Sequence, residues 1–206
     1  MKQKYFIDSH KGATGPFILF LMYYFNQFEN MTAWVYLALH GSYGIMWVMK
    51  SIIFPDKTWE AKCSFFYGIY IWIGLSLYWI SPWIIASESV QNSPLIIGSS
   101  IFSFVIGVFF HFSSDMQKHV HLKLNPGHLI QDGMMAKCRN INYFGEFLIY
   151  VSFAILSCHW LPFIILVLFM AIVWMPNMIK KDKSLSRHPG YEKYKKRTSL
   201  LFPFIW

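Results

Sequence analysis

Long apolar stretches are the feature of this sequence that most constrains its fold. Residues 31–53, 64–86 and 95–112 each run for roughly 18–23 residues, the length that a helix needs to cross a hydrocarbon core of about 30 Å. A bilayer offers no water to bond the backbone, so stretches of this kind are expected to be helices. Only 14% of the residues are charged, against about 25% in soluble domains, which argues against a soluble globule.

The C-terminal apolar stretch, residues 143–179, is too long for one span. It breaks between Cys158 and Pro162, because proline suits the first turn of a new helix. The stretch is therefore expected to form a helical hairpin of residues 143–157 and 161–179.

The fold class that follows is an all-α, polytopic integral membrane helix bundle. Residues 14–28 form a shorter apolar stretch, so the prediction is about six transmembrane helices, or five if that first stretch is not a full span. Pro82 is expected to kink the third span without ending it. We predict one integral membrane domain over residues 1–206, with N-terminal spans in 1–113 and a C-terminal half in 114–206.

The positive charge is confined to a few places. The formal net charge is +8, and all of this excess lies in residues 114–142 and 180–197. With six spans, both segments and the loop 54–63 share one side of the membrane, while the other side has Glu29, Glu88 and no basic residue. This pattern places the basic loops and the C-terminus on the cytosolic or equivalent side of a multi-pass membrane protein.

Several functional classes are disfavoured by the sequence. The three cysteines and eight histidines form no ligand set, although His119 and His121 are close, so no metal site is expected. There is no glycine-rich phosphate loop of the Rossmann or P-loop type. Nucleic acid is not expected as a partner, because membrane topology already accounts for the basic segments.

The first candidate site lies in the long polar loop expected over residues 114–142 and in the start of the next span. If helical, Arg139, Asn142, Tyr143 and Glu146 share roughly one face. Such a group could grip a phosphate, a ribose or a carboxamide. An N-cap with an Arg–Glu pair closing the helix end explains the same residues equally well.

The second candidate site is the basic tail, residues 180–206. Tyr191, Tyr194 and Thr198 follow helical spacing within it. The alternative interpretation is an amphipathic helix at the membrane surface, with its basic residues on lipid headgroups.

These two segments together carry a family resemblance. The stretch from Asp115 to Phe204 resembles the C-terminal domain of the steroid 5-alpha-reductase family, and is most similar to the small membrane proteins built around that domain. The shared elements are, in order, Ser114-Asp115 with Lys118, the run from Arg139 to Glu146, Pro189-Gly190-Tyr191, Tyr194, Arg197-Thr198 and Phe202-Pro203. Ile141 stands where the family usually has proline.

The resemblance implies an intramembrane NADPH site. Asp115 and Lys118 would face the adenosine half of the cofactor. The residues that would line or cover the rest of it are Arg139, Asn142, Tyr143, Glu146, Tyr191, Tyr194 and Arg197. A pyrophosphate and a 2′-phosphate need a positively charged pocket, which agrees with the placement of the basic residues.

The activity implied is that of an NADPH-dependent oxidoreductase acting on CH–CH donors. It would reduce a C=C conjugated to a carbonyl in a lipid or steroid-like substrate that enters from the bilayer. A phenol or carboxylic acid would polarise the carbonyl, and Tyr43, His40 and Glu146 are the candidates for this catalytic role. The alternative for Tyr43, which the sequence favours, is simply an aromatic residue that packs between helices.

Two other functions stay open. The related isoprenylcysteine carboxyl methyltransferases use S-adenosylmethionine, and resemble this chain except for a paired Glu-Glu where it has Lys181-Asp182. A non-catalytic membrane subunit of a larger complex would keep the fold without the chemistry. The expected partners are therefore membrane lipids, a lipid-soluble small molecule and possible membrane protein subunits.

Overall fold

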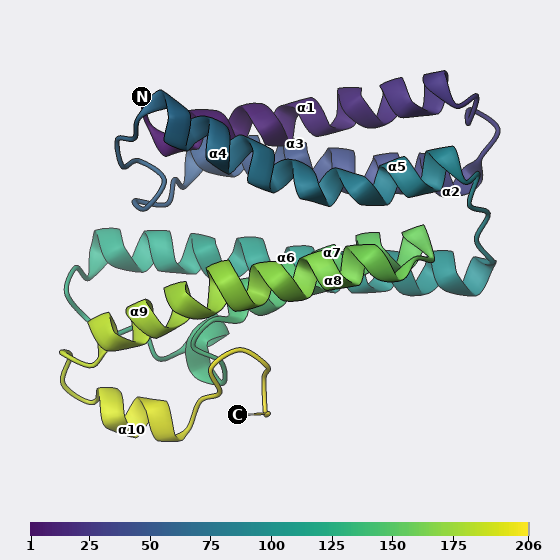
Figure 1. Ribbon diagram of the computed structural model, residues 1–206. Coiled ribbons are helices and arrows are strands. Elements are labelled where there is room, and N and C mark those ends of the chain that lie inside the picture. The colour runs from purple at the N-terminus through teal and green to yellow at the C-terminus, as the bar shows by residue number, and fades with distance from the viewer. Residues whose placement is uncertain (206) are drawn as a thin grey trace. The chain divides into compact units, whose positions relative to one another are not determined.

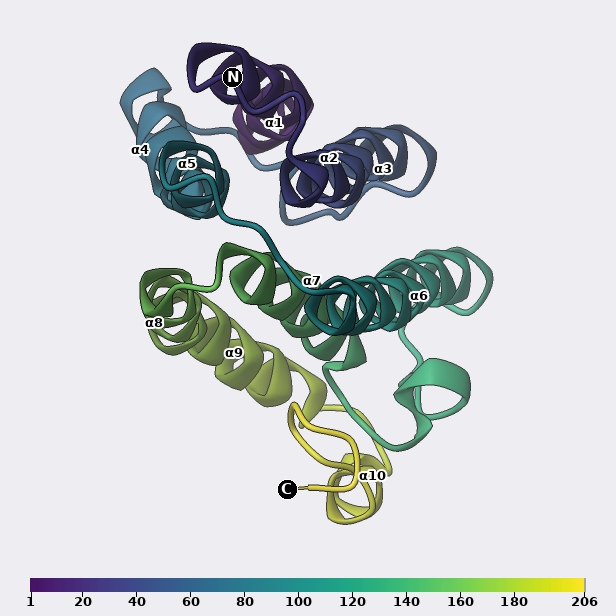
Figure 2. The ribbon, with the colours of Figure 1, turned by 90° about the vertical axis from the view of Figure 1, so that its right-hand side faces the viewer.

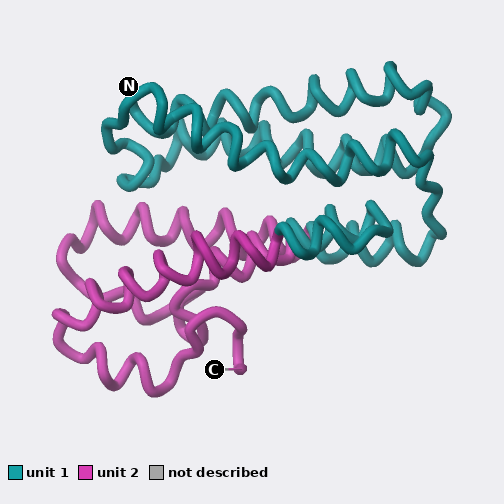
Figure 3. Tube along the Cα trace, in the orientation of Figure 1, with its two compact units in different colours: residues 1–104, 150–165 teal, residues 105–149, 166–206 magenta. Residues whose placement is uncertain are grey.

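The computed structural model describes residues 1–205, and these residues contain helices and isolated β-bridges but no strand (Figure 1). The protein is an all-α membrane helix bundle, which confirms the predicted fold class. Figure 3 distinguishes two compact units. Unit 1 comprises Met1–Phe104 and Tyr150–Ile165, and unit 2 comprises Val105–Ile149 and Leu166–Trp206.

Three long helical segments begin unit 1. The first is α1 (Gln3–Tyr24). The second runs without a break through α2 (Met31–Tyr36), the π-helical turn η1 (Leu37–Gly41) and α3 (Ser42–Ile53). The third consists of α4 (Phe65–Ser76), η2 (Leu77–Trp79) and α5 (Ile80–Ser87). Helix α1 packs against both of the other segments, as Figure 2 shows along the helix axes.

Local sequence signals set the ends and irregularities of these segments. The Asn30 and Ser64 side chains cap the second and third segments by accepting hydrogen bonds from the Ala33 and Tyr67 amides. The short 3₁₀ turn η2 lies just before Pro82, whose ring crowds the carbonyl four residues earlier. The helix then continues to Ser87, so Pro82 does not end it, as predicted.

A glycine allows α1 and α3 to approach closely. A Cβ atom at Gly44 would lie 2.3 Å from the Lys11 carbonyl oxygen, which is a severe overlap with backbone. The contact therefore requires a residue without a side chain, and it holds the adjacent residues of α3 tightly against α1.

Unit 2 is built from the later helices. These are α6 (Pro94–Leu124), η3 (Gly133–Ala136), α7 (Ile141–Ser157), the segment α8 (Trp160–Phe169), η4 (Met170–Trp174) and α9 (Met175–Leu185), and α10 (Tyr191–Lys196). The early residues of α6 and the turn between α7 and α8 belong to unit 1. That turn lies at Cys158, which has a φ of 48°, and Pro162 follows in the first turn of α8. The predicted hairpin break is thus confirmed.

Two predicted boundaries were wrong. Helix α6 extends through residues 114–124, which were expected to be loop, because this stretch is free of glycine and proline until Pro126-Gly127. Asp115 and Lys118 therefore lie on a helix. The first apolar helix spans Gln3–Tyr24 instead of residues 14–28, and the chain turns at Asn26, whose φ is 54°.

Within residues 1–205, three helices are long and apolar enough to cross a membrane, by length and composition: Phe65–Ser87, Pro94–Leu124 and Trp160–Leu185. Ile141–Ser157 is apolar but shorter. These helices indicate membrane association. The number of spans and their orientation stay predictions.

Candidate functional site

The site in unit 2 is organised by a buried arginine that precedes α7. Arg139 is 6% exposed, and its Nε and Nη2 atoms donate to both carboxylate oxygens of Asp182 on α9 at 3.1–3.2 Å. Its Nη1 donates to the Thr198 carbonyl oxygen at 2.6 Å and to the Thr198 hydroxyl at 3.1 Å. One side chain thus joins α9 to the segment that follows α10. We call this arrangement of Arg139, Asp182 and Thr198 the clasp.

The clasp settles one of the alternatives left open by the sequence. Arg139 lies before the first residue of α7, so it does not share a helical face with Asn142 and Glu146. Among the described residues its ionic partner is Asp182, and not Glu146. The interpretation as an Arg–Glu pair closing the helix end was wrong, because the tertiary fold brings a carboxylate from α9 to the guanidinium.

Backbone and polar contacts extend the clasp along the tail. The Arg139 amide donates to the Ser199 carbonyl, and the Ser199 amide donates to the Lys137 carbonyl, both at 3.0 Å. The Asn140 side chain donates to the Leu200 carbonyl at 2.9 Å. Lys181 on α9 donates to the Arg139 carbonyl at 2.8 Å. The tail is therefore folded against the segment before α7, and the two predicted candidate segments form one site.

Helix α10 contributes two buried phenols. Gly190 precedes it with a φ of 81°, a left-handed conformation that glycine adopts without strain and that turns the chain from α9 into α10. Tyr194 is 1% exposed and its hydroxyl donates to the Met135 carbonyl at 2.8 Å. Tyr191 is also buried, and burial, followed by the nearby charge of Asp182, raises its pKa to about 12.

A histidine and an aspartate on α6 lie against α7. The His111 Nδ1 is 3.1 Å from the Asn142 carbonyl oxygen, which can only accept, so Nδ1 carries the proton. The Nε2 atom faces Asp115 one turn later at 3.9 Å, and both side chains are almost fully buried. His111 was missed by the sequence reasoning. Its i, i+4 spacing with Asp115 would have been informative if the helix had been extended beyond residue 113.

Several buried polar atoms in this unit lack a protein hydrogen-bond partner, and the Asn142 Oδ1 is one of them. The buried phenol of Tyr191 lies close to Asp182. Buried polar groups are nearly always bonded, so such atoms are candidates for bonds to a ligand. Lys181 lies within electrostatic range of Lys118 and Asp115, which places cationic groups in the same region. The region therefore combines an amide acceptor, a phenol and positive charge.

The remaining predicted residues of unit 2 lie around these groups. Glu146 is half-buried on α7, one turn after Asn142. The ring of Tyr143 packs beside Trp174 with centroids 5.6 Å apart. Arg197 is exposed, and its Nη2 donates to the Gln131 side chain at 3.0 Å and to the Gln131 carbonyl at 3.2 Å.

The predicted proton donors Tyr43 and His40 belong to unit 1. Both are fully buried, and the His40 Nδ1 lies 2.9 Å from the Tyr36 hydroxyl. The Lys11 Nζ is 4.5 Å from the centroid of the Tyr43 ring and donates to the Tyr150 hydroxyl at 2.8 Å. Tyr43 thus contributes to an aromatic cage around a buried lysine, and its role as a proton donor stays a prediction.

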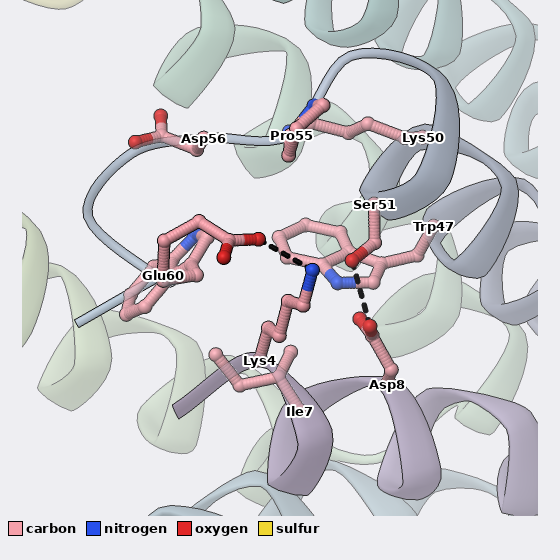
Figure 4. Close-up of a pocket in the computed structure, with 10 residues that line it drawn as sticks. Lys4, Ile7, Asp8, Trp47, Lys50, Ser51, Pro55, Asp56 and Glu60 are labelled. Atoms are coloured by element: carbon pink, nitrogen blue, oxygen red, sulfur yellow. Dashed lines mark hydrogen bonds and ion pairs between the residues drawn. The ribbon is translucent and has the colours of Figure 1, made fainter. Parts of the chain in front are cut away.

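A hollow in unit 1 lies between the start of α1, the end of α3 and the loop that follows (Figure 4). Its polar groups largely bind one another. The Ser51 hydroxyl donates to Asp8 at 2.6 Å, and Lys4 forms an ion pair with Glu60. The predicted site residues do not line this hollow, so it is separate from the candidate site.

Metal ligands do not gather in the described chain. Within residues 1–205, no group of three or more His, Cys, Asp or Glu side chains is placed to hold a metal ion.

A comparison with known protein families identifies the family of this chain. A family model described as "Protein of unknown function (DUF1295)" matches residues 53–198. The chain belongs to the DUF1295 family. No curated protein matches this DUF1295 chain. The matched region contains every predicted cofactor residue from Asp115 to Arg197, together with the clasp, whereas His40 and Tyr43 lie outside it.

Proposed function

We propose that this DUF1295 protein is a membrane-embedded reductase that uses NADPH to reduce a C=C conjugated to a carbonyl in a lipid or steroid-like substrate. The observation that carries the proposal is the buried Asn142 Oδ1, which has no hydrogen-bond partner and belongs to the same unit as the cations Lys118 and Lys181. The resemblance of residues 115–204 to the steroid 5-alpha-reductase C-terminal domain supports it.

The residues present fit the parts of the cofactor. A nicotinamide carboxamide carries an N–H₂ donor that matches the free acceptor Asn142 Oδ1. Phosphates need cations, which Lys118 on α6 and Lys181 on α9 would supply, with Asp115 on the adenosine side. The rest of the cofactor would be surrounded by Tyr143, Glu146, Tyr194 and Arg197.

Arg139 takes a different part in this proposal. Most of its donors bond to Asp182, Thr198 and the Lys195 carbonyl, so it holds the tail in place. We assign it a positioning role, through which α10 and its two tyrosines are kept over the site. A cofactor contact by Arg139 would first require these bonds to be broken.

NADPH supplies a hydride when it is bound. The substrate carbon β to the carbonyl would accept this hydride, and the proton that the α carbon then needs would come from an acid group of the chain. The chain would polarise the carbonyl with an acid group, and Tyr43, His40 and Glu146 stay the candidates. A substrate soluble in lipid would reach the site through the bilayer that the apolar helices occupy.

The proposal includes a topology. Six helical segments would cross the membrane, with the loop 54–63, the segment before α7 and the tail on the cytosolic or equivalent side. This arrangement places the basic residues where the positive-inside rule expects them, and makes the site accessible to a soluble nucleotide.

A binding experiment tests the proposal directly. The full chain, purified in a neutral detergent, is titrated with NADPH, NADH and S-adenosylmethionine, and NADPH is expected to bind most tightly. Asn142→Leu should weaken NADPH binding roughly 3- to 10-fold, the value of one hydrogen bond. The matched control is Asn125→Leu, the same change at an exposed position in unit 2.

A second pair of variants tests the phosphate contacts. Lys118→Met should reduce the preference for NADPH over NADH, whereas Lys123→Met, at an exposed position on the same helix, should leave it unchanged. Tighter binding of S-adenosylmethionine would instead support methyl transfer. Failure to bind either cofactor, with copurification of fixed partners, would support a non-catalytic subunit. Either outcome would overturn the reductase proposal.

A further inference from the structure

The tertiary structure turns some basic residues of the C-terminal half inward and leaves others exposed. Arg139 and Lys181 point into unit 2 and are bonded within it. Six others on α9, α10 and the turn between them are exposed: Lys180, Lys183, Arg187, Lys193, Lys195 and Lys196. We call these six residues the basic face. They take no part in the proposed cofactor site, so their concentration requires a separate explanation.

The outward direction of the basic face follows from the packing of α10. Its inner side is fixed by Tyr191 and Tyr194, which are buried, so the lysines between and after them must point outward. The clasp holds this segment through the Thr198 and Lys195 carbonyl oxygens. The basic face is therefore a folded surface rather than a loose polybasic tail.

The position of the basic face along its helix places it at membrane headgroups. The segment Trp160–Leu185 has 26 residues. A helix of that length is ~39 Å long, whereas the hydrocarbon core is about 30 Å thick. Apart from Asn177, its exposed residues are apolar as far as Ile179, and Lys180 and Lys183 follow at once. The basic residues thus begin where the helix leaves the hydrocarbon.

Apolar side chains lie on the segment that follows α10. Phe204 is 83% exposed and Ile205 is 68% exposed. Figure 1 shows this segment continuing from the end of α10 and then turning back on itself. Exposed apolar groups next to a basic surface are typical of proteins that lie against a lipid interface, where the apolar groups enter the acyl boundary.

We propose that the basic face binds the anionic headgroups of membrane phospholipids, with Phe204 and Ile205 inserted beside them. Charge complementarity and continuity with a membrane-spanning helix favour a lipid surface over a nucleic acid or an acidic protein. Bound lipid would hold α10, and the tyrosines that it carries, at a fixed height on the membrane.

The test uses the full chain in a neutral detergent, titrated separately with dioctanoyl-phosphatidylserine, dioctanoyl-phosphatidylcholine and inorganic phosphate. Phosphatidylserine is expected to bind, and its affinity should fall as salt rises. The triple variant Lys193→Gln, Lys195→Gln, Lys196→Gln should weaken this binding roughly 100-fold, at about fivefold per charge. Arg139 of the clasp donates to the backbone carbonyl oxygen of Lys195, so changes to the lysine side chains leave this bond intact.

The matched control removes three exposed lysines elsewhere: Lys57→Gln, Lys62→Gln and Lys123→Gln. This variant should bind phosphatidylserine like the wild type, and if the first triple variant fails to fold, Lys183→Gln with Arg187→Gln replaces it. Equal binding of phosphatidylcholine, equal losses in both variants, or tighter binding of inorganic phosphate or of a single-stranded RNA 20-mer would overturn the proposal. NADPH binding should be unchanged in every variant, which separates this result from the proposed function.

Discussion

Replacement of Arg139 by methionine should release the tail from the segment before α7. The variant leaves the Asp182 carboxylate, 17% exposed, without its partner, and it also removes the donors to the Thr198 and Lys195 carbonyls. Breaking a buried ion pair from one side costs about 3–5 kcal/mol, and the partial exposure of Asp182 favours the lower end. A loss of about 3 kcal/mol corresponds to a roughly 100-fold increase in local opening.

Hydrogen exchange reports this opening at one amide. The Ser199 amide donates to the Lys137 carbonyl across the tail, so its exchange requires the tail to separate. Its protection should fall roughly 100-fold in Arg139→Met. The control Arg197→Met removes an exposed arginine bonded to Gln131 and should cost at most about fivefold.

The double variant Arg139→Met with Asp182→Met provides a further check. It removes the stranded carboxylate and should regain part of the lost protection. Protection of Ser199 that stays within threefold of wild type in Arg139→Met, or that falls equally in the Arg197 control, would refute the assignment of the clasp.

Three other outcomes follow from the structure. Gly145→Ala should lower the free energy of unfolding in detergent by about 1–3 kcal/mol, because the new Cβ would lie 2.4 Å from the His111 amide nitrogen. The control Gly98→Ala places a Cβ where nothing lies within 4 Å, and it should be neutral or stabilising. Equal melting temperatures of the two variants would contradict this prediction. Burial raises the pKa of the Cys138 thiol, so at pH 8 Cys138 should be alkylated far more slowly than the exposed Cys158. The alkylation rate of Cys138 should rise with pH. Similar rates for the two cysteines would show that the tail does not cover Cys138. The pKa of Tyr191 is raised from 10.0 to about 12, so the stability that its neutral phenol contributes is complete below pH 10 and is lost as the pH rises through 12. The absorbance at 295 nm should therefore contain a step near pH 12 that Tyr191→Phe removes. If Tyr191→Phe removed a step near pH 10 instead, the burial of this phenol would be contradicted.

The helices were largely predictable from the sequence, because each depends on local information. The stretch 31–53 is continuous helix with the predicted bounds, since apolar length and an Asn30 cap both act within a few residues. The break at Cys158 followed from Pro162 in the same way. The end of α6 was missed because hydropathy falls at residue 113 while helix propensity does not, and the prediction followed hydropathy.

The candidate site was predictable only in part. The structure brings both predicted segments together in unit 2, while their role in binding an anion stays a prediction. The partner of Arg139 was not predictable, because Asp182 lies 43 residues away and is one of two acidic residues within the basic tail. The buried, unbonded Asn142 Oδ1 could not be inferred either, since burial of a single atom depends on packing from several helices.

By itself, the sequence determined that this chain is a bundle of helices associated with a membrane and that its positive charge lies in two short segments. Both properties follow from composition and from spacing along the chain. A bilayer requires helices wherever an apolar stretch crosses it, and the placement of Lys and Arg depends on the loops alone. Only the tertiary structure decided which basic side chains turn inward to the clasp and which remain on the basic face. The direction of the exposed lysines depends on the inward packing of Tyr191 and Tyr194. This packing fixes the orientation of α10 and therefore of the charges that α10 carries.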